Sequence, residues 1–226
     1  THLRPERDFA FDLAELEITP GTTLVVIVNP NNPNGGVFDL SPLPGLLRRH
    51  PDVHFLVDEA FIGLAGQSVA HRVPEFPNLL VTRTLSKAHS LAGFRVGYAI
   101  LPDALADDLN CHNDAYPLAR PSQAAALATL QHEDQIRMRV EQLRAWTEAL
   151  AEALRALGVR TFPTQTYFFL ADFAPHDAAE LAARLRERGI FVKPLGDARL
   201  GPGYMRVTTA VSADNARVIE ALRELL

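Results

Sequence analysis

The sequence predicts an α/β protein, in which a large domain built on a mainly parallel sheet is followed by a smaller α+β domain. The first half alternates short apolar runs with polar loops, and the second half opens with a long helical pattern before strands and helices alternate again. The short runs are rich in Val, Ile and Leu and lack polar alternation, which is typical of strands covered on both faces.

Four apolar runs are the expected strands of the large domain, at residues 24–28, 53–60, 79–86 and 97–101. Between the first two, the segment SPLPGLLRRHP at 41–51 predicts a short helix. A strand, a helix and a second strand in this order indicate a βαβ unit with parallel strands. Because ligands of such sheets collect at the carboxyl ends of the strands, the residues after each run are the first candidates for a site.

The second half is expected to begin with one long helix over residues 121–157, which has no internal glycine or proline. The pattern after Gly158 predicts a strand at 167–173, a helix at 177–189, strands at 190–195 and 204–210, and a closing helix near 213–225. We therefore expect residues 1–115 to belong to the large domain. Residues 116–226 would hold the linking helix and the small C-terminal domain.

Composition excludes several classes of protein. The 226 residues are 47% hydrophobic and 22% charged with a net charge of −5, a balance typical of a folded globular chain rather than a nucleic-acid or membrane binder. The single cysteine, Cys111, cannot form an internal disulfide, and the N-terminus has no signal-peptide core. We therefore expect a cytoplasmic protein. The eight histidines show no ligand spacing, so no metal site is expected.

Two stretches present polar side chains at the ends of predicted strands. NPNNPNGG, at 29–36, follows the first strand and either forms a simple turn or presents an asparagine amide to a ligand. VDEAF, at 57–61, ends the second strand with Asp58, a partly buried aspartate that needs a partner or serves as a strand-end cap.

Two further stretches add cations. In TRTLSKAHSLAGFRVGYAI, at 82–100, Lys87 is a candidate nucleophile if it lies in an enclosed cleft. Ser86 and Arg95 supply a hydroxyl and a fixed cation, which together suit a phosphate. In YMRVTTA, Arg206 pairs a carboxylate of the protein or of a ligand. Each stretch alone also has an ordinary structural explanation.

The combination is more specific than its members, because an amide, a carboxylate, a Ser-Lys pair and an arginine follow one another at successive strand ends. Pyridoxal 5′-phosphate needs all of them. Its aldehyde forms a Schiff base with a lysine, its ring nitrogen takes a carboxylate, its phenolic oxygen takes a donor, and its phosphate takes Ser and Arg. The sequence therefore predicts this cofactor.

With these blocks the sequence resembles the fold-type I, class I/II aminotransferases, and among them the histidinol-phosphate aminotransferases most. The family's NPNNPTG, VDEAY and RTLSKxxxLAGxRxGY blocks are similar to NPNNPNG, VDEAF and RTLSKAHSLAGFRVGY here, and its I-x-V-R-P-L and L-R-V-T to IFVKPL and YMRVT. The similarity runs from about residue 8 to the C-terminus. Family members carry a further N-terminal segment without a counterpart here, so we expect a truncated form.

The resemblance implies a role for each matched residue around the cofactor. Lys87 would be the Schiff-base lysine and the base that moves a proton between Cα and the cofactor. Asp58 would keep the ring nitrogen protonated, and Asn32 would hydrogen-bond the phenolic oxygen. Ser86 and Arg95 would bind the phosphate.

On the substrate side, the resemblance implies that Arg206 binds the carboxylate of an amino acid or, in a histidinol-phosphate enzyme, the substrate phosphate. Two departures bear on this assignment. Lys193 replaces the arginine of the V-R-P-L block and supplies a point charge instead of a bidentate fork. Phe61 replaces a tyrosine and removes one hydroxyl that would contact the phenolic oxygen.

The resemblance implies a homodimeric aminotransferase of histidine biosynthesis, acting on histidinol phosphate or a related amino acid and 2-oxo acid pair. A decarboxylase of the threonine-phosphate type, from cobalamin biosynthesis, is the first alternative, because both reactions break a bond at Cα. The second is a non-catalytic fragment that acts as an interaction module, since the family's N-terminal segment has no counterpart.

Overall fold

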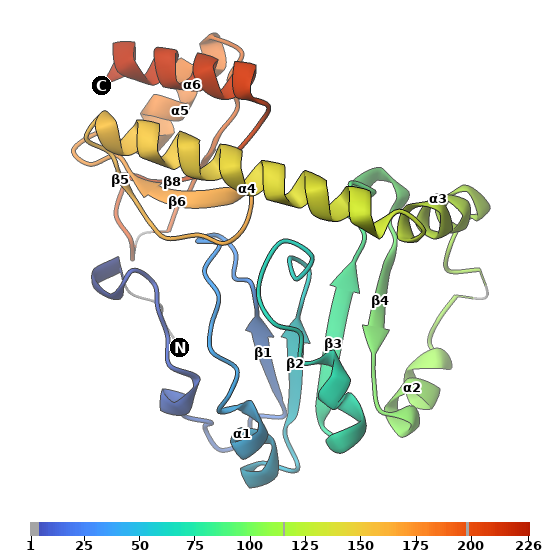
Figure 1. The fold of residues 1–226 in the computed structure, drawn as a ribbon. Helices are drawn as coiled ribbons and strands as arrows, with labels where there is room; N and C mark the ends of the chain where they lie inside the picture. The colour runs from blue at the N-terminus through green and yellow to red at the C-terminus, as the bar shows by residue number, and fades with distance from the viewer. Residues whose placement is uncertain (1–4, 115, 198) are drawn as a thin grey trace. The chain divides into compact units, whose positions relative to one another are not determined.

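The computed structural model describes residues 5–114, 116–197 and 199–226, which form two compact units (Figure 1). Unit 1 comprises Phe11–Pro30 and Val37–Met138, and unit 2 comprises Asn31–Gly36 and Arg139–Leu226 together with the described residues up to Ala10. The domain boundary expected at 115/116 falls on Ala115, which lies outside the described residues, and that boundary stays a prediction.

Unit 1 is built on a four-stranded sheet in the order β1-β2-β3-β4. Its strands are β1 (Leu24–Val28), β2 (His54–Asp58), β3 (Leu79–Thr84) and β4 (Gly97–Ile100). β1, β2 and β3 pair in parallel, and β4 is antiparallel to β3. The helix α1 (Leu43–Arg49) connects β1 to β2. The predicted βαβ unit and the mainly parallel sheet are therefore confirmed.

The core of unit 1 lies on one face of this sheet. Phe55 and Val57 of β2 and Val81 of β3 are fully buried. Alternate residues of a strand point to the same face, and Val81 pairs with Val57, so the three side chains lie on one face of the sheet. They pack in one cluster with side chains of α1 and of the 3₁₀ helix η3 (Ala70–Glu75).

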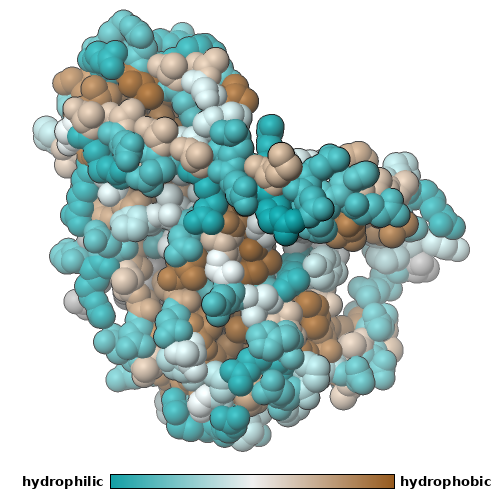
Figure 2. Space-filling model, in the orientation of Figure 1, coloured by the Kyte–Doolittle hydropathy of each residue, from teal (hydrophilic) through white to brown (hydrophobic). Residues whose placement is uncertain are grey.

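The opposite face corrects one expectation from the sequence. On that face, Leu24 and Val26 of β1 are 50% and 54% exposed. On the core face, Tyr98 of β4, which pairs with Arg83, is 45% exposed. The expectation that the strands are covered on both faces is therefore wrong for the two edge strands of the described chain. Figure 2 shows brown apolar patches among the teal ones over this sheet.

The helix expected over 121–157 is also wrong as a single element. Two helices occupy the segment, α3 (Arg120–Leu130) and α4 (Glu133–Ala156). The backbone N–H of His132 donates to the Thr129 carbonyl, a short-range bond that ends α3. α4 then opens with two acidic residues, whose charge favours a helix N-terminus. A further helix that the pattern did not predict, α2 (Asp103–Asn110), precedes α3.

Unit 2 contains an antiparallel sheet in the order β5-β6-β8-β7. Its strands are β5 (Arg160–Thr161), β6 (Phe168–Asp172), β7 (Lys193–Pro194) and β8 (Tyr204–Thr208), and its last two helices are α5 (Ala178–Glu187) and α6 (Ser212–Leu225). Figure 1 shows α4, α5 and α6 on one side of this sheet, and their apolar side chains share one core cluster with it. The predicted α+β arrangement is confirmed.

Two strand predictions in unit 2 need adjustment. The strand expected at 190–195 pairs with β8 only over Lys193–Pro194, since a proline has no N–H for the ladder. The pair Arg160–Thr161 was not predicted as a strand and adds β5 to the edge beside β6. In the part of the chain that the structure describes, no helix has both the length and the apolar character to cross a membrane.

Candidate active site

The carboxyl ends of β2 and β3 carry the residues predicted in unit 1. β2 ends at Asp58, and β3 ends at Thr84, directly before the loop that holds Ser86 and Lys87. β2 and β3 are parallel neighbours, with Asp58 opposite Thr82. Parallel strands end at the same edge of a sheet, so the structure brings the carboxylate and the Ser-Lys pair to one edge.

Asp58 is a half-buried carboxylate with one oxygen already engaged. Its Oδ1 accepts from the backbone N–H of Ala60 at 3.0 Å and lies 3.4 Å from the Thr82 hydroxyl, which donates to it. The Ala60 contact is the local bond expected of an ordinary strand-end aspartate. Because both bonds are to Oδ1, Oδ2 is the oxygen suited to accept a hydrogen bond from a ligand.

Lys87 packs against the loop that follows β2. Its Nζ lies 5.2 Å from the centre of the Phe61 ring, within the range of a cation–π contact. Phe61 itself is only 6% exposed. Close by, a Cβ added to Gly63 would lie 2.7 Å from the Cβ of Ala88. The loop after β2 and the loop that holds Lys87 therefore approach each other closely, with no room for a side chain at position 63.

The loop that holds Ser86 and Lys87 is hydrogen-bonded to Thr84, the last residue of β3. The Thr84 hydroxyl accepts from the backbone N–H of Ser86 at 3.1 Å and lies 2.9 Å from the Ser86 hydroxyl. Arg95 has a φ of 56° and Ser90 a φ of 59°, a left-handed conformation that is costly for residues with a Cβ. Arg95 Nη1 donates to the Ala92 carbonyl, and the Arg95 side chain is exposed. A hydroxyl and a guanidinium thus belong to one strained loop.

A second group of predicted residues belongs to unit 2. Arg206 Nη1 donates to Asn32 Oδ1 at 3.0 Å, and the guanidinium lies 5.2 Å from the Phe168 ring centre. Arg206 Nε is buried and has no hydrogen-bond partner among the described residues. Lys193 stands directly opposite Arg206 in the β7–β8 pair. Burial raises the pKa of Tyr167, and the charge of Arg206 opposes that shift.

The turn that carries Asn32 is docked within unit 2 by Gly35. The φ of Gly35 is +76°, and an added Cβ would lie 2.0 Å from Thr164 Oγ1 and 2.9 Å from the Phe168 carbonyl. The Gly35 carbonyl accepts from the backbone N–H of Gln165 at 2.9 Å. Only glycine fits this conformation and this space. Asn32, predicted at a strand end of the large domain, is therefore positioned by unit 2.

The predicted residues thus fall into two groups, each described within its own unit. Lys87, Asp58, Ser86, Arg95 and Phe61 belong to unit 1. Asn32, Lys193 and Arg206 belong to unit 2.

Sequence reasoning missed an ion pair beside Asp58, between the buried Glu59 and the partly buried Arg83. Glu59 is 1% exposed and accepts from Arg83 Nε at 2.9 Å, from the Ser68 hydroxyl at 2.9 Å and from the Val69 backbone N–H at 2.8 Å. Arg83 also donates to the Ser68 hydroxyl. The available signal was a second acidic residue directly after Asp58 and an arginine inside an apolar strand.

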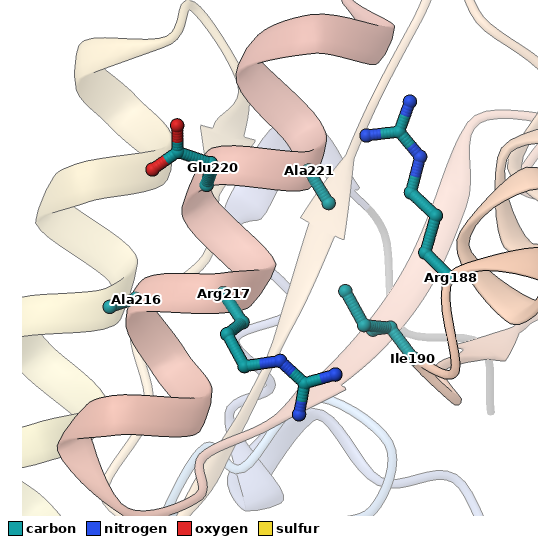
Figure 3. Close-up of a pocket in the computed structure, with 6 residues that line it drawn as sticks. All are labelled: Arg188, Ile190, Ala216, Arg217, Glu220 and Ala221. Carbon is teal, nitrogen blue, oxygen red and sulfur yellow. The ribbon is translucent and has the colours of Figure 1, made fainter.

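A pocket elsewhere in unit 2 contains none of the predicted residues. It is shallow, with a volume of about 330 Å³, and lies between the end of α5 and α6 (Figure 3). Its lining is Arg188, Ile190, Ala216, Arg217, Glu220 and Ala221. Both of its arginines form ion pairs with acidic residues of α6. Among the described residues, no three His, Cys, Asp or Glu side chains gather as a metal site would require.

The fold and these side chains define a class of protein, an α/β chain with an amine, a carboxylate and a hydroxyl at the carboxyl ends of parallel strands. The family model for aminotransferase class I and II matches residues 1–223. The chain belongs to that family.

A curated relative, histidinol-phosphate aminotransferase 2 of Thiobacillus denitrificans, is 38% identical over 205 residues, which cover 89% of this chain and 57% of the relative. The chain therefore spans little more than half of that relative's length.

Two solved structures have the same fold. L-Threonine-O-3-phosphate decarboxylase from Porphyromonas gingivalis has a TM-score of 0.85 at 26% identity, covering 95% of this chain and 67% of that chain. Histidinol-phosphate aminotransferase from Sinorhizobium meliloti, in complex with pyridoxal 5′-phosphate, has a TM-score of 0.80 at 26% identity, covering 90% of this chain and 58% of that chain. The family and the second structure indicate pyridoxal 5′-phosphate as the cofactor.

Proposed function

We propose that the protein is a pyridoxal-phosphate-dependent aminotransferase that acts on histidinol phosphate, or on a related amino acid, with a 2-oxo acid as acceptor. The observation that carries the proposal is that Lys87 and Asp58 follow or end adjacent parallel strands, at one edge of the sheet. The similarity to a named histidinol-phosphate aminotransferase supports the substrate class.

In unit 1, each residue would meet a different part of the cofactor. Lys87 would be the Schiff-base lysine, and its amine would afterwards carry the proton removed from the substrate Cα. Asp58, through Oδ2, would hold the ring nitrogen protonated. Ser86 and Arg95 would hold the phosphate. When bound, the cofactor supplies an electron sink for the carbanion at Cα.

The Phe61 ring would serve as a wall beside the Lys87 amine. This role is supported by the 5.2 Å separation between Nζ and the ring centre. A phenylalanine cannot donate a hydrogen bond, so it would orient the amine by packing and by the cation–π contact alone.

In unit 2, the residues would bind the substrate's acidic group. Arg206 and Lys193 are like charges directly opposite each other on neighbouring strands, an arrangement that is destabilising unless an anion lies between them. The buried Arg206 Nε without a partner among the described residues is a donor that an anion would satisfy. Because Asn32 Oδ1 is engaged with Arg206, its amide Nδ2 would be the donor to the phenolic oxygen.

The chain offers a sharp test, because Lys87 and Lys193 are its only two lysines. Pyridoxal 5′-phosphate is added, the visible absorbance of lysine-bound cofactor is recorded, and the product is reduced with borohydride and mapped by mass spectrometry. We expect the label on Lys87, loss of the band in Lys87→Ala, and retention of the band in the matched control Lys193→Ala. Label on Lys193, or a band that survives Lys87→Ala, would contradict the proposal.

Decarboxylation is the second candidate, because the decarboxylase from Porphyromonas gingivalis has the highest TM-score of the structures compared above. Incubation with histidinol phosphate and with threonine phosphate separates the two reactions. Accumulation of the pyridoxamine form indicates amino transfer, and release of carbon dioxide indicates decarboxylation. No lysine-bound band with the 226-residue chain would favour the third reading, a non-catalytic interaction module.

We also propose that the protein is a cytoplasmic homodimer. Apolar side chains exposed on α3 and at the start of α4 support an association surface, namely Leu127, Leu130 and Met138. Sedimentation equilibrium would test it, since a single species of 24.8 kDa would be a monomer. Substituting Leu127 by Asp should shift a dimer toward that mass, because a charge on an apolar interface is costly.

A further inference from the structure

We propose that Arg83, acting through Glu59 and Ser68, is a positioning residue that fixes the strand ends from which Asp58 and Lys87 project. The inference rests on the proposed function for its consequence, because it concerns how the lysine and the carboxylate are held toward one cofactor. It assigns a task to a buried polar group that the proposed chemistry leaves unused.

Glu59 is the residue directly after the last residue of β2. Consecutive strand residues point to opposite faces, so Asp58 and Glu59 lie on opposite sides of the β2 end. The backbone N–H of Glu59 donates to the Thr82 carbonyl of β3 at 2.8 Å, and its side chain extends the buried face that Val57 begins. Any movement of Glu59 would therefore move Asp58, its direct neighbour.

Arg83 lies near the end of β3. It is the penultimate residue of β3, and the loop that holds Ser86 and Lys87 begins directly after the strand. Its Nε and Nη2 both lie 2.9 Å from Glu59 Oε2. In the β3–β4 pair it stands opposite Tyr98 of β4. Arg83 thus connects the ends of three strands.

The loop after β2 also contacts the ion pair, through Ser68 and Val69. The Ser68 hydroxyl contacts both Arg83 and Glu59, and Glu59 Oε1 accepts from the Val69 backbone N–H. This loop also contains Phe61, which packs against Lys87. The ion pair therefore restricts the movement of both the strand that ends in Asp58 and the loop that packs against Lys87.

The charges argue for positioning more than for stability. Glu59 is buried and the Arg83 side chain is 25% exposed. A largely buried ion pair contributes little to stability compared with apolar side chains of similar volume. The role of this pair is therefore to restrict the positions that its two partners, and the strand ends that carry them, can take. Burial of Arg83 would lower the pKa of its guanidinium, but the interactions with Tyr98 and Glu59 outweigh burial and raise that pKa. The charged form of the guanidinium is therefore favoured in the folded protein.

The other end of the same strands supplies the matched control. Asn78 precedes β3, is 4% exposed, and donates through Nδ2 to the carbonyls of Leu47, His50 and Val53. Asn78→Ala removes a buried polar network from unit 1 as Arg83→Gln does, but at the amino ends of the strands. Loss of either network leaves buried polar groups unsatisfied, so both variants lose stability.

The experiment compares the two variants at equal stability, set by adjusting urea so that their free energies of unfolding match. Amide hydrogen exchange of Ala60 and Ser86, measured by NMR without cofactor, should be at least about tenfold faster in Arg83→Gln than in Asn78→Ala. The dissociation constant for pyridoxal 5′-phosphate should rise by a similar factor only in Arg83→Gln. Arg83→Lys, which keeps one charge, should recover part of both effects.

Equal exchange at Ala60 and Ser86 in the two variants would overturn the inference. If Arg83→Gln does not fold, Ser68→Ala, which removes only the bridging hydroxyl, is the variant compared with Asn78→Ala by the same two measures. If the wild-type chain forms no lysine-bound band, the proposed function fails, and hydrogen exchange alone decides the inference.

Discussion

The two groups of candidate residues are held in place by different physical means. In unit 1, Lys87 and Asp58 are placed by the ends of parallel strands, beside the ion pair between Glu59 and Arg83. In unit 2, Asn32 is placed by a turn that Gly35 docks against hydroxyl groups with no room for a side chain. The first group therefore combines an ion pair with the close approach of two loops, whereas the second depends on close packing of one turn, so the two should respond to different substitutions.

The largest expected effect is on the packed turn. Gly35→Ala adds a Cβ 2.0 Å from Thr164 Oγ1 in a left-handed conformation, and it should lower the free energy of unfolding by about 3 kcal/mol. Gly189→Ala is the control, because Gly189 has a φ of +74° with open space around it and should lose only about 1 kcal/mol from backbone strain. Urea unfolding measures both. Equal losses of unfolding free energy in the two variants would mean that the close packing around Gly35 contributes nothing to stability.

The next effect is on the loop that faces the lysine. Gly63→Ala places a Cβ 2.7 Å from the Cβ of Ala88 and should lower stability by about 1 to 2 kcal/mol, because neither backbone can move freely. Gly93→Ala, which meets nothing within 4 Å, should be near neutral. We also expect borohydride labelling of Lys87 to slow in Gly63→Ala alone. Unchanged labelling would show that this contact does not position the lysine.

A smaller effect, on stability alone, is expected at the N-terminus of α5 in unit 2. Asp177 caps α5, its Oδ1 accepting from the backbone N–H groups of Ala179 and Glu180 at 2.8 and 3.0 Å. Asp177→Ala should lower the free energy of unfolding by about 1 kcal/mol. Labelling of Lys87 should be unaffected, because the cap is in unit 2 and far along the chain from the lysine loop. Slower labelling would show that stability loss alone explains the Gly63 result.

The smallest effect is a pH dependence confined to unit 2. Burial raises the pKa of Tyr167 and of Tyr204 above the value near 10 of a free tyrosine. Their neutral forms stabilise the folded state fully below pH 10, and this contribution is lost as pH rises through the folded-state pKa values. Thermal unfolding between pH 9 and about 11.5 should therefore show declining stability. Tyr167→Phe should make the decline shallower, and an unchanged slope would exclude Tyr167 as a cause.

The sequence predicted the parts of the fold that depend on local pattern. The apolar runs located β1 to β4, because short continuous runs of Val, Ile and Leu are typical of strands. The polar residues at or after the ends of these runs located Asp58 and Lys87. The break between α3 and α4 was not predictable in this way, since no glycine or proline marks it.

Contacts between residues far apart in the sequence also could not be predicted from the sequence pattern. Gly35 meets Thr164, which is far along the chain, and Arg83 meets Glu59 through strand pairing. Only the register of the sheet and the packing of the turn bring such residues together. The contacts that hold each of the two groups of candidate residues are therefore visible in the structure and not in the sequence.

The turn at Asn31–Gly36 also bears on how this chain could be divided or recombined. It packs with unit 2, although its flanking residues belong to unit 1. A gene cut between Met138 and Arg139 would yield a C-terminal fragment that lacks the segment seated against Thr164 and Thr166. Exchange of unit 2 between relatives would then require three segments to be transplanted together, namely the described residues up to Ala10, the turn and the C-terminal segment, which form one module for domain shuffling.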